Sequence, residues 1–295
     1  MKQISKLFLI VTLLFGLAFG GVGVAHGADE SINELLGEPA VVYGGNLSDG
    51  QKEEVRRLLE VDTEEVNEYT VTGQDLQNYI GGNPNSRMFS SVKITQEDKG
   101  HGIVVNIVTA DNITEVTSEM YSNALLTAGI ENALIEVASP VTVSGHSALT
   151  GIYKAYDASG AELDEGRMEV ANEELSLSTE LAEKEGISQE KVTELMTEIK
   201  KEIAEQDPAT REDVEEIVQE QLSKLEIELS EEDRQLLIDL FEKMRDLDID
   251  FGKVRDQLED LTSKIKDRLG DINIDEGFWD KVVNWFKNLF NSIFG

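Results

Sequence analysis

Short apolar runs alternate with amphipathic stretches over the first half of the chain, a pattern that predicts strands and helices in turn. The strand-like runs are residues 39–43, 66–71, 89–95, 103–109 and 134–137. The polar turn Asp98-Lys99-Gly100 separates the runs 89–95 and 103–109, so these two predict a β-hairpin.

Capping residues mark where helices begin between these runs. Ser48 with Gln51 forms a capping box, and Thr72 with Asp75 begins a second helix. A third helix is predicted from Thr114 to Ala128, followed by a glycine, and a fourth follows residue 145. Together these elements predict a mixed α/β domain over residues 28–158, a normal size for one domain.

Residues 159–275 change to an acidic, almost continuously helical pattern. Ser188, Thr210 and Ser230 are expected to begin helices. After Ser230 the apolar residues alternate at spacings of three and four, which predicts one long helix packing along a narrow seam, weakened or bent at Gly252. The seam consists of Leu237, Leu240, Met244, Leu247, Phe251, Val254, Leu258, Leu261 and Ile265.

The partner of this seam is open between two arrangements. Residues 188–229 fold back to form an intramolecular hairpin, or two chains form a coiled-coil dimer. We favour the hairpin in a monomer, because the upstream helices need a packing partner too. The fold class is thus α+β, with an α/β domain followed by a helical region and an amphipathic C-terminal helix.

The tail, residues 276–295, gathers aromatic and aliphatic side chains on one face of a predicted helix. That face contains Phe278, Trp279, Val282, Trp285, Phe286, Leu289, Phe290 and Ile293. Aromatic residues opposite Asn and Lys are typical of a helix lying in a membrane interface. We therefore expect this face to bind a membrane surface or an envelope partner; the alternative is docking onto the protein's own core.

The chain begins with the three-part pattern of a secretory signal over residues 1–27. Lys2 and Lys6 precede an uncharged run from Leu7 to Ala25, and Gly27 stands before the expected cleavage point. An uncleaved membrane anchor is the alternative, because the run is close to membrane-spanning length. In both cases the remaining chain is expected outside the cytoplasm of a bacterium, secreted or membrane-associated.

Charge and composition exclude several classes of function. Lys and Arg total 26 against 59 Asp and Glu, a net charge of −33, which argues against a nucleic-acid partner. The chain has no cysteine, which excludes disulfides, thiol catalysis and cysteine-bound zinc. It has three histidines, of which His26 lies in the expected signal, which argues against a multi-histidine metal site. No metal or other cofactor is predicted.

Two segments invite comparison with catalytic or metal sites. Ser144-Gly145-His146-Ser147 places a hydroxyl near an imidazole, but the Gly-x-Ser-x-Gly elbow is absent and a helix N-cap is expected instead. Residues 246–250 imitate a calcium loop that fails at Phe251 and Gln257, so they are expected to form a helix face. No catalytic residue is predicted.

Residues 112–129 and 138–156 resemble the signature segments of the domain of unknown function 1002, a family of exported bacterial proteins. The similarity extends from about Gly37 into the acidic helices and includes Asn172-Glu173-Glu174-Leu175. His146 departs from the family, which usually has a small hydroxyl residue there. The resemblance implies an exported protein with this layout and brings no activity, cofactor or partner.

These segments carry more polar side chains than packing requires, and we expect some to line a pocket for a polar ligand. The candidates are Asn112, Thr114, Thr117, Tyr121, Asn123, Ser144, Thr150 and Lys154. The sequence favours an exported, non-catalytic envelope protein that binds a ligand or partner. The alternatives are a hydrolase acting on envelope polymers through Asp or Glu, and calcium or polycation buffering by the acidic segment.

Overall fold

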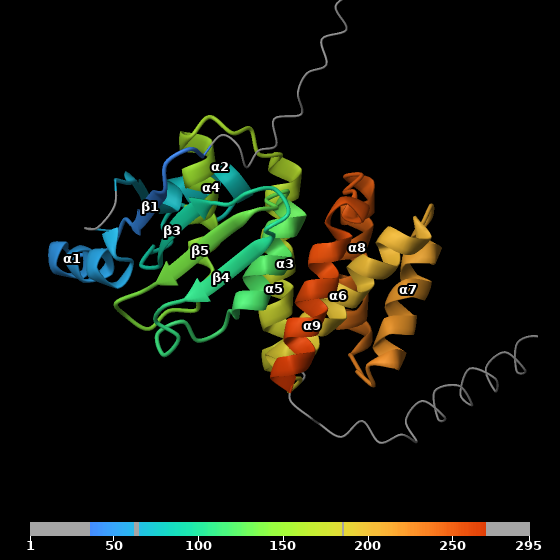
Figure 1. Ribbon diagram of the computed structural model, residues 1–295. Coiled ribbons are helices and arrows are strands. Elements are labelled where there is room, and N and C mark those ends of the chain that lie inside the picture. The colour runs from blue at the N-terminus through green and yellow to red at the C-terminus, as the bar shows by residue number, and fades with distance from the viewer. Residues whose placement is uncertain (1–35, 62–64, 185, 270–295) are drawn as a thin grey trace, which may run out of the picture. The chain divides into compact units, whose positions relative to one another are not determined.

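A computed structural model describes residues 36–61, 65–184 and 186–269, which form a five-stranded sheet and a set of helices (Figure 1). The strands are β1 (Ala40–Gly44), β2 (Asn67–Val71), β3 (Ser91–Gln96), β4 (Ile103–Ile107) and β5 (Ala133–Ala138). Their order is β2-β1-β3-β5-β4, and only β3 runs antiparallel to its neighbours. The carboxyl ends of the other four strands therefore meet at one edge of the sheet.

The helices of the α/β part are α1 (Asp49–Leu58), α2 (Gly73–Ile80), α3 (Ser118–Ala128) and α4 (Ser147–Ala158). The helical part contains α5 (Glu165–Lys184), α6 (Gln189–Gln206), α7 (Arg211–Lys224), α8 (Glu231–Asp246), a 3₁₀ helix (Phe251–Val254) and α9 (Arg255–Leu269). The prediction of an α+β fold, with a mixed sheet followed by a helical region, is confirmed.

Most predicted helix starts are confirmed by their caps. The capping boxes at Ser48 and Thr72 are both present, and Ser188 and Ser230 cap α6 and α8. The predicted start at Thr114 is wrong, because Thr117 caps α3. The backbone of Thr114 instead donates a hydrogen bond to the Val143 carbonyl, which keeps this stretch extended beside the loop after β5.

The predicted hairpin between residues 89–95 and 103–109 is wrong. β5 lies between β3 and β4, antiparallel to the first and parallel to the second. The chain passes from β4 to β5 through α3, the crossover that parallel neighbours require. β5 is largely buried, as a central strand needs, whereas β4 exposes Asn106 and takes the edge.

The sheet sends alternate side chains of β1 into two cores. Ala40 and Val42 join the main core, while Val41 and Tyr43 pack with Val55 of α1 in a smaller one. The main core continues without interruption from the sheet through α3 and α5 into the remaining helices. Figure 1 shows α3 and α5 between the sheet and helices α6 to α9.

The predicted single helix over the heptad seam is also wrong. α8 ends at Asp246, Asp248 adopts a left-handed conformation with φ of 52°, and the 3₁₀ helix leads into α9. The aspartates at 246–250 therefore lie at a helix end and in a turn, not on a helix face. The break lets α8 pack on α5 and α7 while α9 packs on α6.

The seam side chains are buried within the chain, except Leu247, which is 37% exposed. The monomeric state stays a prediction. None of the helices in the described part combines the length and hydrophobicity needed to cross a bilayer. The expected signal (1–27) and the aromatic tail (276–295) lie outside the described residues.

Candidate functional site

A cleft of about 680 Å³ opens at the edge of the sheet where the parallel strands end. It is lined by Gln51, Leu76, Ser86, Arg87, Met88, Phe89, Val141, Thr142, Val143, Ser144, His146, Ser147 and Asn172. Open α/β sheets bind ligands outside the carboxyl ends of their strands, and ligand pockets usually have about 300–1,000 Å³. Position and size make this cleft the candidate site.

One wall of the cleft is held by backbone contacts between the loop after β1 and the segment before β3. Asn46 accepts a hydrogen bond from the Met88 N–H through its side chain (2.7 Å) and donates its own N–H to the Met88 carbonyl (3.0 Å). A Cβ at Gly44 would lie 2.5 Å from the same carbonyl oxygen. Glycine therefore allows the close approach that places Arg87 and Phe89 at the cleft.

The opposite wall is the turn that leads into α4. Gly145 has a φ of 112°, and its carbonyl accepts a 2.7 Å hydrogen bond from the buried Tyr121 hydroxyl. A Cβ at this position would lie 2.7 Å from that hydroxyl oxygen. The turn thereby places Ser144, His146 and Ser147 along the cleft. The expected side-chain N-cap is absent, because His146 takes the N-cap position of α4 without capping it.

His146 links the cleft to α5. Its Nδ1 lies 3.2 Å from Ser144 Oγ and 3.9 Å from a Glu115 carboxylate oxygen, and its Nε2 lies 3.2 Å from Thr179 Oγ1. A catalytic triad needs the serine and the acid on opposite ring nitrogens. Here both approach Nδ1, so the arrangement suits ligand positioning rather than nucleophile activation. Burial lowers the pKa of His146, against the opposing effect of Glu183.

The predicted ligand residues do not gather in one place. Of the eight, Ser144 lines the cleft. Thr114 and Thr117 line a second groove of about 430 Å³ between β4 and the start of α3. Asn112 donates a 2.8 Å hydrogen bond to the Ser139 carbonyl, and Tyr121 supports Gly145. These side chains satisfy nearby backbone groups, which explains why packing alone did not account for them.

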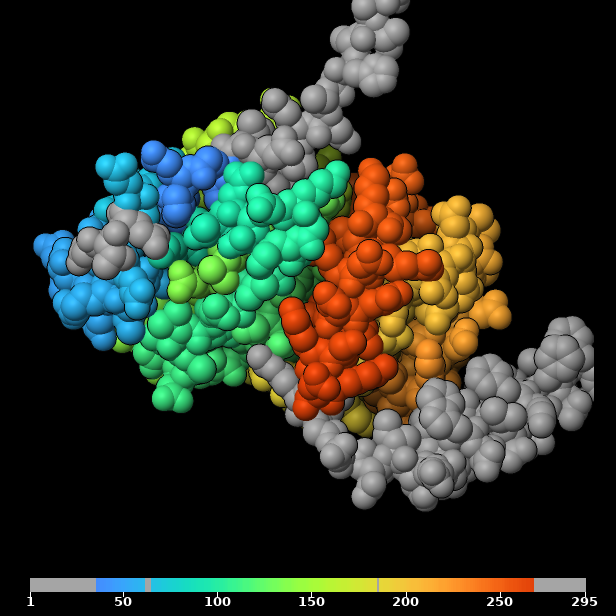
Figure 2. Space-filling model, in the orientation of Figure 1, coloured from blue at the N-terminus to red at the C-terminus, as the bar shows by residue number. Residues whose placement is uncertain are grey.

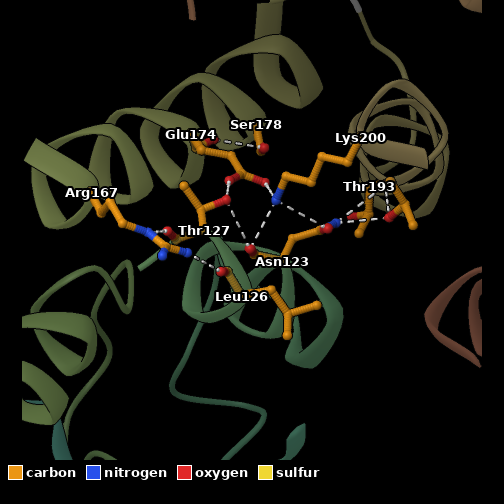
Figure 3. Close-up of polar contacts among 9 residues, drawn as sticks. Asn123, Leu126, Thr127, Arg167, Glu174, Ser178, Thr193 and Lys200 are labelled. Carbon is orange, nitrogen blue, oxygen red and sulfur yellow. Dashed lines mark hydrogen bonds and ion pairs between the residues drawn. The ribbon is translucent and has the colours of Figure 1, made fainter. Parts of the chain in front are cut away.

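The three remaining candidates face other parts of the structure. Asn123 is buried between α3 and α6 (Figure 3). Its amide donates to Thr197 Oγ1 at 2.9 Å. Lys154 donates to Asp75 at 3.0 Å, which ties α4 to α2. Thr150 is buried in α4. Thus one of the eight predicted ligand residues, Ser144, lines the cleft, and most of the others form hydrogen bonds within the surrounding structure.

The cleft has an unusual charge character for so acidic a chain. None of its lining residues, all of them in the described part, is Asp or Glu. Arg87 lies over the Phe89 ring, 5.5 Å from its centroid, and the other polar groups are amides, hydroxyls and one imidazole. Sequence reasoning missed Arg87 and Phe89, although two family-like segments did contain His146 and Asn172.

Among the residues that the structure describes, no group of three or more His, Asp or Glu is placed to hold a metal ion. Burial raises the pKa of Glu115, with a further contribution from Glu183, and Glu115 is not among the residues that line the cleft. The arrangement can hold a polar ligand through several donors and acceptors.

The chain is similar to a protein family and to a bacterial relative. A family model described as "Protein of unknown function (DUF1002)" matches residues 43–261. The uncharacterized protein YpuA of Bacillus subtilis (strain 168) is 37% identical over 203 residues, covering 66% of this chain and 68% of the relative. No solved structure matches. The resemblance predicted from residues 112–129 and 138–156 is confirmed, and the chain belongs to the DUF1002 family of proteins of unknown function.

Proposed function

We propose that this protein is an exported, non-catalytic binding module of the bacterial cell envelope, which holds a polar ligand in the cleft at the carboxyl edge of its sheet. The observation that supports this most is the lining of the cleft. It combines amide and hydroxyl side chains with Arg87, His146 and an aromatic ring, and it lacks carboxylates.

The chemistry of the lining favours a hydroxyl- and amide-bearing ligand such as an amino-sugar fragment of the cell wall. Gln51 and Asn172 offer planar amides, and Thr142 offers a hydroxyl with them. Phe89 offers a half-buried ring on which the apolar face of a sugar can lie. A volume of about 680 Å³ suits a ligand of one or two sugar rings.

The hydrolase alternative has less support from the residues that line the cleft. Glycosidases need two carboxyl groups about 5–10 Å apart across the scissile bond. The lining of the cleft contributes no carboxyl group. Ser144 has the wrong relation to His146 and Glu115 for a triad. Binding without turnover therefore accounts for the lining better.

The test is calorimetry or ligand-observed NMR with residues 28–295 and disaccharide or muropeptide fragments of peptidoglycan. We expect saturable binding that weakens at least about tenfold in Phe89→Ala, since stacked and buried contacts dominate small binding sites. Val108→Ala is the matched control: it truncates an exposed apolar side chain outside the cleft, and it should bind like the parent.

Three results would count against the proposal. Binding that is unchanged in Phe89→Ala, or absent for every fragment, would show that the cleft is not the site of a glycan ligand. Release of new reducing ends or free peptides during the incubation would instead support the hydrolase alternative.

The rest of the proposal concerns location. The expected signal would bring residues 28–295 outside the cytoplasm, and the aromatic tail would hold the protein at a membrane surface or an envelope partner. Processing is tested by the N-terminal sequence of the protein recovered from cells. Cleavage after Gly27 supports the signal, whereas an intact hydrophobic run would indicate an anchor.

A further inference from the structure

β4 ends the sheet and leaves one side of its backbone open. Gly102 and Val108 on either side bond to β5 through Ala133 and Val137. By alternation, the N–H groups of Ile103, Val105 and Ile107 point away from β5. Ile103 donates outward to the side chain of Gln257 at 3.2 Å, but no described hydrogen bond reaches the N–H of Val105 or Ile107.

A groove of about 430 Å³ runs along this open edge. Residues 105–107 of β4 form one wall, and Thr117, Ser118 and Gln189 at the starts of α3 and α6 form the other. Figure 2 shows β4 at the surface of the molecule, close to α9. An unpaired edge beside a partly apolar groove is the geometry that accepts an added strand.

The C-terminal end of α9 lies near this groove. Thr262 of α9 donates a hydrogen bond to Glu198 of α6 at 3.1 Å. Lys266, one turn later in α9, attracts the carboxylate of Glu194, one turn earlier in α6. α9 therefore runs antiparallel to α6 and reaches Leu269 beside the first turn of α6. Gln189, the first residue of α6, itself lines the groove, so the chain leaves α9 next to it.

The sequence directly after α9 alternates as a strand does. Following Gly270 it reads Asp271-Ile272-Asn273-Ile274-Asp275. Two β-branched residues share one face and three polar residues share the other, which is the period-two pattern of a half-buried strand. With Gly270 as the turn, the chain has to cover only a short distance from α9 to the groove. A few extended residues, at about 3.3 Å each, are enough.

We propose that residues 271–275 pair with the open edge of β4 as a sixth, antiparallel strand. The two patterns match face to face. Val105 is buried and Asn106 is exposed, so Ile272 and Ile274 would lie on the groove side while Asn273 lies beside Asn106. The added strand supplies partners for the N–H groups of Val105 and Ile107, and it places the aromatic tail at this edge of the sheet.

Disulfide trapping tests the pairing, and the absence of native cysteines removes any background. In residues 28–295, Asn106→Cys is combined with Asp271→Cys, Asn273→Cys or Asp275→Cys, which all lie on the same face. The matched control combines Asn106→Cys with Asn288→Cys in the tail. We expect one of the three strand pairs to form an intrachain disulfide at least about tenfold faster than the control.

Failure of all three strand pairs, or linking no faster than the control, would overturn the proposal. Disulfide-linked dimers in place of intrachain links would also overturn it, because the occupant of the edge would then be a second copy.

Amide hydrogen exchange gives an independent measurement. Ile274→Pro disrupts the added strand and changes no residue of β4. We expect it to speed exchange at Val105 and Ile107 at least about tenfold. The N–H groups of Val104 and Asn106 bond to β5 and serve as internal controls that should not change. Equal exchange at Val105 and Ile107 in both proteins would overturn the proposal.

Discussion

The ammonium group of Lys200 lies 2.6 Å from a carboxylate oxygen of Glu174, and neither side chain reaches solvent (Figure 3). Lys200 also donates to the Asn123 carbonyl at 2.8 Å, and Thr127 donates to the second oxygen of Glu174 at 2.6 Å. The pair thereby joins α6, α5 and α3 inside the core. Burial lowers the pKa of Lys200, and the adjacent Glu174 opposes that effect.

Removing one partner of this pair should destabilise the fold strongly. Lys200→Met leaves the Glu174 carboxylate buried without its counter-ion, which typically costs about 3–5 kcal/mol of unfolding free energy. Urea denaturation measures the loss. The control is Lys243→Met, which breaks an exposed pair with Glu173 between α8 and α5 and should cost less than about 1 kcal/mol. Equal losses in the two variants would contradict the structural role of the Lys200–Glu174 pair.

Gly145→Ala should destabilise the fold and weaken ligand binding together. The new Cβ would meet the Tyr121 hydroxyl at 2.7 Å in a left-handed backbone conformation, and the turn that carries His146 would have to move. Gly160→Ala is the control, because Gly160 also has a positive φ (88°) but nothing lies within 4 Å of its Cβ position.

Backbone strain at a positive φ costs about 1–3 kcal/mol in both variants, and the clash should add about 1–3 kcal/mol in Gly145→Ala alone. Thermal unfolding measures the difference between them. If Gly145→Ala were no more destabilised than Gly160→Ala, Tyr121 would not constrain the turn.

Acidification should cost stability through His146. Burial lowers its folded pKa below the ordinary value of 6.5, so between these two values the unfolded chain binds more protons than the folded one. The free energy of unfolding therefore rises with pH across that window. Below the folded pKa the full loss of stability is reached. Glu115 and Glu183 are the carboxylates that act on this imidazole.

NMR titration of residues 28–295, which contain His101 and His146, measures the imidazole pKa directly. In His146→Gln the His146 part of the pH dependence should vanish, so the stability difference between the two proteins should change across the window below pH 6.5. A His146 pKa above 6.5 would contradict the desolvated position that the structure describes.

The tail should decide membrane association. Residues 28–295 are expected to co-sediment with zwitterionic liposomes, whereas residues 28–275 should stay in solution, because the aromatic face supplies the apolar area for binding. Trp285→Ser should weaken binding, and Asn284→Ser, on the polar side, should not. If neither length of the protein binds, the tail docks onto protein instead.

Local patterns in the sequence determined the helix starts and the family. Ser48 and Gln51, like Thr210 and Asp213, find their partners within three residues, so their capping boxes form as the local sequence predicts. The segments 112–129 and 138–156 likewise sufficed to indicate the family. Two predicted starts differ: the Thr114 N–H donates to the distant Val143 carbonyl instead of beginning a helix, and α4 begins at His146 without a side-chain cap.

Only the tertiary structure decided the strand order, the break in the seam and the cleft. No local signal shows that β5 separates β3 from β4, or that α9 turns away to pack on α6. The cleft joins Arg87, Ser144 and Asn172 from three distant segments. Lys200 looks like a solvated charge in the sequence and is buried in the fold. Such pairings depend on contacts between residues far apart in the chain, whereas caps depend on neighbours a single turn away.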